Sequence, residues 1–151
     1  MQISARAEYA VRALLALVAN AERTVTAQAL ADDQELPRKF LEAILSDLRR
    51  AGLIHSQRGA EGGYRLARPA EEISVGDVLR AVDGPLAVVR GGRPEQARYE
   101  GAAGHLQTVW VALRAAVRSV LDEVSLADVL RGDFAAHVKA LIDTPDAWSP
   151  R

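Results

Sequence analysis

Cationic side chains gather in residues 38–68, which hold seven Lys or Arg and three Asp or Glu, although the chain of 151 residues has a formal net charge of −1. Arg38 and Lys39 stand side by side, and Glu42 and Ala43 follow one helical turn later. Guanidinium and ammonium groups bind phosphates or guanine edges, and a carboxylate can accept from the amino group of cytosine. The pattern indicates contact with nucleic acid. It leaves open whether the two cations would read bases or hold phosphates.

Another cation, Arg58, precedes a glycine-rich run with the sequence GAEGG. An arginine at the base of such a loop can enter a narrow minor groove, where the negative potential is enhanced. Gly62 and Gly63 carry no side chain and would let the backbone approach a ligand closely. Upstream, Thr26 and Gln28 could hold phosphates through hydroxyl, amide and backbone N–H groups. These residues complete the predicted DNA-contacting set.

A helix–turn–helix followed by a hairpin would position these side chains. Thr26 can cap a short helix that extends to about Asp32, and Pro37 can begin a second helix that ends at Gly52. Its buried face is predicted to be Leu41, Ile44, Leu45 and Leu48. Residues 53–58 and 64–67 then read as two strands around the glycine run, which makes a wing.

The rest of the chain divides by pattern. Amphipathic helices are predicted over residues 3–20 and 73–83, so residues 1–83 form the DNA-binding domain. Residues 84–104 lack periodicity and are expected to be an exposed connector, residues 105–144 a dimerisation helix with a C-terminal helix, and residues 145–151 a tail. The predicted fold class is mainly α with a small β-wing: a winged helix–turn–helix domain plus a long dimerisation helix.

Beyond residue 105, apolar residues recur in steps of four and three, a spacing typical of the seam between paired helices. The predicted seam comprises Leu106, Trp110, Leu113, Val117, Val120 and Val124. Two copies of the chain packing together would cover this stripe. The alternative is an ordinary amphipathic helix that packs back onto its own domain.

Composition excludes several classes of protein. The chain has no cysteine, so it has no thiolate metal ligand, disulfide or thiol redox switch. The glycines of the GAEGG run lead into a second strand and not a helix, so they are not a nucleotide-binding fingerprint. No nucleophile–base set or phosphate-cradling loop is present, which argues against an enzyme. Arg6, Glu8 and Arg12 interrupt the apolar N-terminal run, so no membrane span is expected and the protein is predicted to be cytoplasmic.

The ordered motifs resemble the Rrf2 family of bacterial regulators. The resemblance covers about residues 1–130, through ISARAEYAVRALLAL, ISVGDVLRAVDGP and SLADV. Its most specific part runs from Leu48 to Leu66 and has the pattern L-x-x-x-G-L-[IV]-x-S-x-R-G-x-x-G-G-Y-x-L. The resemblance implies a homodimer with two winged heads joined by long helices, binding a palindromic operator in double-stranded DNA, in the manner of a repressor. A winged-helix module that regulates through a protein partner is the alternative.

The sequence also departs from that family. Members that sense iron, nitric oxide or redox state ligate an iron–sulphur cluster with three cysteines between the wing-side helix and the dimer helix. Here that stretch reads VRGGRPEQARYEGAAGHLQT, and its thiolates are missing. One subgroup adds a Glu and a His from the first helix, and Arg12 stands where that His would be, although Glu8 matches. We therefore expect no cluster and no other cofactor or metal.

A small-molecule effector or a protein partner would then supply the signal. Cluster-binding relatives carry their sensor where the first helix, the connector and the dimer helix meet, so we expect any effector pocket there. Tyr9, His105 and Trp110 could line it with aromatic and polar groups. Alternatively, Trp110 belongs to the dimer core and His105 only begins a helix.

Overall fold

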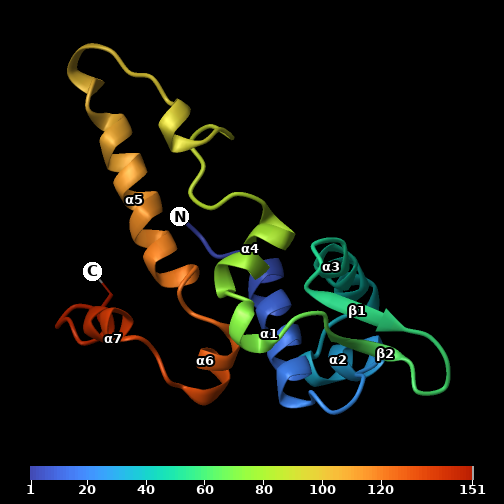
Figure 1. Ribbon diagram of the computed structural model, residues 1–151. Coiled ribbons are helices and arrows are strands. Elements are labelled where there is room, and N and C mark those ends of the chain that lie inside the picture. Colours follow the sequence, from blue (N-terminus) through green and yellow to red (C-terminus); the bar gives the residue numbers. More distant parts are fainter. Residues whose placement is uncertain (151) are drawn as a thin grey trace.

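The computed structural model describes residues 1–150, and Figure 1 shows a winged head with a separate long helix beside it. The helices are α1 (Ala5–Ala19), α2 (Ala27–Gln34), α3 (Arg38–Arg50), α4 (Val75–Asp83), α5 (Leu106–Leu121), α6 (Leu126–Arg131) and α7 (Ala136–Ile142); the strands are β1 (Ile54–Gln57) and β2 (Gly63–Leu66). We call α1–α4 with the two strands the head, and α5 the arm. The mainly helical fold with a small β-wing is confirmed.

Side-chain caps define where several helices begin. The Ser4 hydroxyl accepts from the Ala7 N–H at 2.9 Å, and the Thr26 hydroxyl accepts from the Ala29 N–H at 3.1 Å. Ser74 and Ser125 begin α4 and α6 with capping boxes. Each cap satisfies a backbone donor that the helix leaves free and stabilises the helix by about 1 kcal/mol. The first helix therefore begins at Ala5, and Ile3, which the predicted range of 3–20 included, is outside the helix and 55% exposed.

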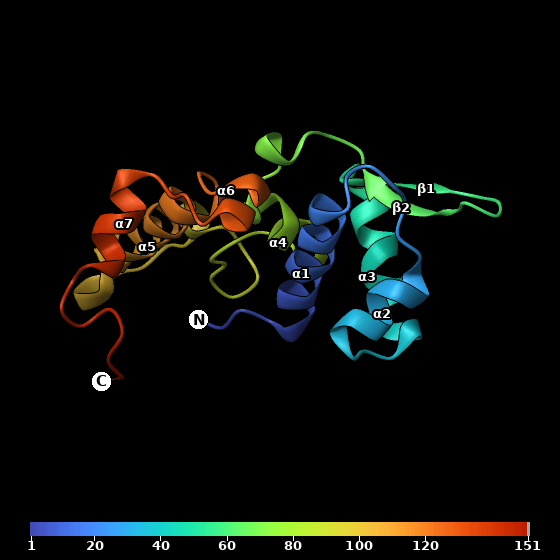
Figure 2. The same ribbon diagram turned by 90° about the horizontal axis from the view of Figure 1, so that it is seen from below.

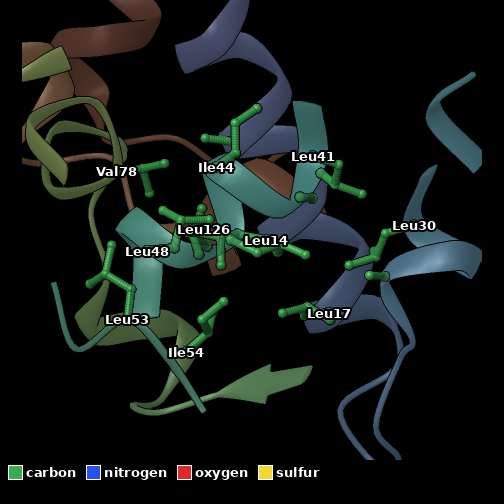
Figure 3. Close-up of a cluster of buried hydrophobic side chains, with 14 of the residues drawn as sticks. Leu14, Leu17, Leu30, Leu41, Ile44, Leu48, Leu53, Ile54, Val78 and Leu126 are labelled. Atoms are coloured by element: carbon green, nitrogen blue, oxygen red, sulfur yellow. The ribbon is translucent and has the colours of Figure 1, made fainter. Parts of the chain in front are cut away.

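The hydrophobic core lies where α1, α3 and α4 meet (Figure 3). It contains the predicted buried face of α3 together with side chains from the neighbouring elements, namely Leu14, Leu17, Leu30, Leu53, Ile54, Val78 and Leu126. Burying one such side chain contributes about 1.5–3 kcal/mol. Leu126 comes from α6, which follows the arm along the chain. The predicted boundary at residue 105 therefore divides elements that share one hydrophobic core.

The wing is a two-stranded antiparallel hairpin. Ile54 pairs with Leu66 at its base and Gln57 with Gly63 near its turn. Val25 adds a bridge on the outer edge of β2, exchanging backbone hydrogen bonds of 2.9 and 2.8 Å with Tyr64. This bridge places the beginning of α2 beside the wing. Figure 2 shows the hairpin extending from the head on the side away from the arm.

The C-terminal part returns to the head after the arm. α6 begins at the predicted position and packs on α1, and α7, which the sequence did not distinguish, follows it. The His137 Nε2 lies 2.8 Å from the carbonyl oxygen of Ser119 and ties α7 to the arm. The connector contains two 3₁₀ turns. It is exposed only in part, because Pro94 is fully buried. None of the helices formed by residues 1–150 combines the length and apolar character that crossing a bilayer requires.

Candidate nucleic-acid interface

The outer face of α3 is presented by a tight turn. Glu35 adopts the left-handed conformation (φ 55°) after α2, the Leu36 N–H donates to the carbonyl of Ala31 at 2.9 Å, and Pro37 precedes the first turn of α3. A non-glycine residue seldom adopts this conformation, and no local signal predicted it. With the leucine face of α3 buried, the structure leaves exposed the four residues expected to contact DNA: Arg38, Lys39, Glu42 and Ala43.

Arg38 and Glu42 form an ion pair on this exposed face. The Arg38 Nε donates to Glu42 Oε1 at 2.9 Å across one helical turn. An exposed pair of this kind stabilises a helix by no more than about 0.5 kcal/mol. Its structural effect is to hold the guanidinium by Nε, and within residues 1–150 the two terminal nitrogens form no hydrogen bond. A guanidinium can bind guanine through two such donors.

Contacts that the sequence did not predict hold α3 on α1. Asp47, in the second half of α3, forms ion pairs with Arg6 of α1 and, at 3.1 Å, with Arg50. The rings of Tyr9 and Phe40 meet edge to face with centroids 6.0 Å apart, and the Arg12 guanidinium lies 5.4 Å from the Tyr9 centroid. These contacts fix the orientation of α3 on the head.

In the wing, Arg58 is exposed at the loop base, and the two glycines have a packing role that the sequence did not predict. A Cβ on Gly62 would lie 2.7 Å from the carbonyl oxygen of Gln57, and a Cβ on Gly63 (φ 147°) would lie 2.7 Å from that of Val25. Both glycines are therefore required by close approaches within the head. The Thr24 hydroxyl donates to the carbonyl of Glu61 at 2.8 Å and ties the loop to the segment before α2.

Thr26 and Gln28 stand at the beginning of α2. The Thr26 hydroxyl caps the helix, and Gln28 Nε2 donates to Asp32 Oδ1 at 2.7 Å. The Val25–Tyr64 bridge brings this helix end next to the wing. Figures 1 and 2 both place α2, α3 and the wing on one half of the molecule, away from the arm and α7.

The arm carries apolar side chains that its own chain does not cover. Leu113 is 40% exposed, and Val109, which the predicted seam did not include, is 54% exposed. Trp110 is half-buried, and its Nε1 donates to the Tyr99 hydroxyl of the connector at 3.0 Å. Val117 and Val120 line an apolar groove of about 320 Å³ together with Ile3 and Leu121.

The seam prediction was wrong at its last member. The arm ends at Leu121, and Val124, which is 7% exposed, is buried within its own chain. Its carbonyl accepts from the Val75 N–H at 2.9 Å. The sequence showed only the spacing of the apolar residues, and the spacing continues past the point where the helix stops.

The predicted effector pocket does not form within one chain. The Tyr9 ring contacts Phe40 and Arg12 in the head, whereas His105 is exposed at the beginning of the arm and Trp110 pairs with Tyr99. Figure 1 shows the beginning of α5 far from α1. A groove of about 920 Å³ lies instead between α4, the connector and the arm, with ionic side chains that include Asp77, Arg80, Arg114, Arg118 and Asp122.

The donor chemistry does not fit an iron–sulphur cluster. The chain has no cysteine, and clusters are held by thiolates. Within residues 1–150, no group of three or more His, Cys, Asp or Glu side chains is placed to hold a metal ion.

A helix–turn–helix with an exposed cationic first turn, followed by a wing, defines a winged-helix DNA-binding regulator and not an enzyme. Residues 3–132 match the Rrf2 family, described as an iron-dependent transcriptional regulator, and the chain belongs to this family. A Mycobacterium tuberculosis protein named as a candidate HTH-type transcriptional regulator is 51% identical over 144 residues, which cover 95% of this chain and 89% of that protein. CymR of Bacillus subtilis, an HTH-type transcriptional regulator, is 33% identical over 85% of this chain and 89% of its own.

Solved structures give the same result. The structure of CymR, the global cysteine regulator of B. subtilis, superposes with a TM-score of 0.74 at 32% identity and covers 87% of this chain and 98% of that one. IscR of T. potens superposes with a TM-score of 0.71 at 32% identity, covering 87% of this chain and 88% of that one. The comparisons therefore agree with the winged-helix fold and with a function as a transcription regulator.

Proposed function

We propose that the chain is a homodimeric repressor that binds a palindromic operator, with α3 in the major groove and the wing in the adjacent minor groove. The observation that carries the proposal is the set of exposed polar side chains at the beginning of α3, a helix that lies on the same half of the molecule as the wing. Insertion of the first turn of the second helix is how a helix–turn–helix docks on DNA.

Within α3, we assign base recognition to the Arg38–Glu42 pair. Arg38, held by Glu42 at 2.9 Å, would donate its terminal nitrogens to guanine, and Glu42 would accept from cytosine N4. Lys39 has a flexible point charge and suits a phosphate. The exposed position of Ala43 on this face suits contact with a thymine methyl group.

Around α3, the remaining contacts would go to the DNA backbone and the minor groove. Thr26 and Gln28 would hold a phosphate at the beginning of α2, where helix N–H groups and the dipole favour an anion. Arg58 would enter the minor groove from the wing. Gly62 and Gly63 support this contact indirectly, by allowing the tight packing that holds the loop.

Dimerisation would use the exposed side of the arm. Leu113 and Val109 lie on one stripe of α5, which gives two arms an apolar surface to share. Leu106, Trp110, Val117 and Val120 flank that stripe. A dimer of this kind places two copies of α3 where a two-fold palindrome can receive both.

The test is operator selection followed by titration. Genomic fragments that the purified protein retains should share a palindrome, and fluorescence anisotropy on that palindrome should give an affinity that falls steeply with salt, because phosphate contacts release counterions. An affinity that depends neither on the DNA sequence nor on the salt concentration would reject the proposal. It would favour a winged-helix module that acts through a protein partner.

The signal would be a small-molecule effector or a partner protein in the cytoplasm, where the DNA is. The groove of about 920 Å³ between α4 and the arm replaces the predicted Tyr9 pocket as the candidate effector site, because it lies where the head meets the arm. An effector should shift the anisotropy titration described above, and a groove variant should lose that shift.

A further inference from the structure

The end of the arm meets the first turn of α4 at very close range. The Leu126 N–H donates to the carbonyl of Ile73 at 2.9 Å, and the Val75 N–H donates to that of Val124 at the same distance. Gly76 faces the end of the arm, and a Cβ there would lie 2.2 Å from Asp122 Oδ1 and 3.1 Å from the carbonyl oxygen of Leu121. The absence of a side chain at residue 76 is what lets the two helices approach.

A chain of ion pairs crosses this junction. Asp122, directly after the arm, accepts from Arg80 of α4 at 2.5 Å and from Arg118 of the arm at 3.0 Å. Arg80 also lies 3.7 Å from Asp77, which in turn lies 3.8 Å from Arg68, just beyond the wing. Of the two short contacts, the one with Arg80 crosses from the end of the arm to α4, so this carboxylate is a polar side-chain link between arm and head.

The surroundings of Asp122 stabilise its ionised form. Burial acts to raise the pKa of this carboxyl, but the hydrogen bonds and charges of Arg80 and Arg118 outweigh it and hold the pKa below its ordinary value. The side chain is 26% exposed, so solvent screens the pair less than it would at the surface. The carboxylate is therefore ionised and paired at neutral pH.

In a dimer that is joined through its arms, each arm is held against the arm of the other copy. The angle between arm and head then sets the separation of the two α3 helices. Half-site spacing is the quantity that such a dimer reads on DNA. A polar link that fixes this angle therefore affects which operators are bound without touching DNA.

We propose that Asp122, held against Gly76 and paired with Arg80, is the positioning residue that sets the angle between arm and head and thereby the operator spacing. The proposal rests on the dimeric DNA binding proposed above. An independent readout on the protein alone therefore has to accompany DNA binding. The lack of cysteine provides one, because a single introduced thiol can be spin-labelled selectively.

The experiment uses the full chain with Asp33→Cys, an exposed position on α2, labelled for pulsed dipolar spectroscopy without DNA. Asp122→Asn keeps the side-chain shape and removes the charge, and Gly76→Ala forces the same junction apart by packing. The matched control is Glu123→Gln, which removes one negative charge from the next residue, whose carboxylate faces His137. Each dimer is also titrated with the selected operator and with versions that have one base pair added or removed between half-sites.

The unchanged chain and Glu123→Gln should give one narrow distance distribution and prefer one spacing by about tenfold. Asp122→Asn and Gly76→Ala should broaden or shift the distribution and reduce that preference to about twofold or less, while sedimentation still shows a dimer. Wild-type distributions and spacing preference in both junction variants would overturn the proposal. A dipolar signal without any DNA binding would instead reject the proposed function, and no dipolar signal in any chain would reject the dimer.

Discussion

Arg58 is the side chain on which the proposed minor-groove contact depends. It is exposed at the loop base, and within residues 1–150 no hydrogen bond or ion pair holds its side chain. Arg58→Ala should weaken operator binding by about 1–3 kcal/mol, as expected for the loss of one charged DNA contact. Fluorescence anisotropy at physiological salt measures this loss. Arg131→Ala, on the exposed surface of α6, is the matched control and should bind as the unchanged chain does; equal affinities for all three chains would remove the wing from the mechanism.

Glu42 should determine specificity more than affinity. Its carboxylate holds Arg38 at 2.9 Å and can accept from cytosine, and it also repels phosphates. Glu42→Gln should therefore reduce discrimination against a changed base at one operator position by about 1–3 kcal/mol, with little loss of total affinity. A panel of single-base operator variants titrated in parallel measures this. If discrimination were unchanged at every position, Glu42 would have no part in base reading.

At the scale of elements, the wing depends on its glycines for shape. Gly63→Ala would force a left-handed residue to carry a side chain and bring its Cβ within 2.7 Å of the Val25 carbonyl. Strained backbone conformations cost about 1–3 kcal/mol, so the melting temperature should fall. Gly92→Ala, where the nearest atom lies at an ordinary 3.6 Å, is the control and should melt close to the unchanged chain. Calorimetry measures the three melting temperatures. If Gly63→Ala melted as the unchanged chain does, the packing role of Gly63 would be contradicted.

The elements that carry local signals could be predicted, and the contacts between them could not. The leucine face of α3, the cap at Thr26 and the glycines of the hairpin all lie within short stretches, so local patterns located the helix–turn–helix and the wing. The Arg80–Asp122 pair joins residues 42 positions apart, for which no local pattern exists. The same limit explains why Tyr9 was grouped with Trp110: sequence order does not say which helices meet.

Dimerisation is a property of the whole molecule, and the structure shows which variants test it. Val109→Asp with Leu113→Asp changes two side chains that one chain leaves exposed, so the head should keep its fold. Two arms brought together would then bury like charges at a cost of several kcal/mol, and sedimentation should show a monomer with a helical circular dichroism spectrum. Replacing Val117 with Asp would disturb the groove beside Ile3 as well, so that change tests the seam less cleanly. A folded dimer of the Val109 and Leu113 variant would place the interface elsewhere.

Regulation is a property of the whole chain, and the lack of cysteine leads us to expect that it does not use an iron–sulphur cluster. A cluster requires thiolates, and thiol oxidation requires cysteine, and the sequence contains none. The purified protein should therefore be colourless, and its operator affinity should stay within about twofold after exposure to peroxide, nitric oxide or thiol reductants, because twofold corresponds to only about 0.4 kcal/mol. The measurement is an anisotropy titration before and after each treatment, with the iron content determined on the same sample. A brown preparation with stoichiometric iron would mean that ligands outside this chain complete a cluster, and a redox-dependent affinity without iron would require a sensor that does not use sulphur.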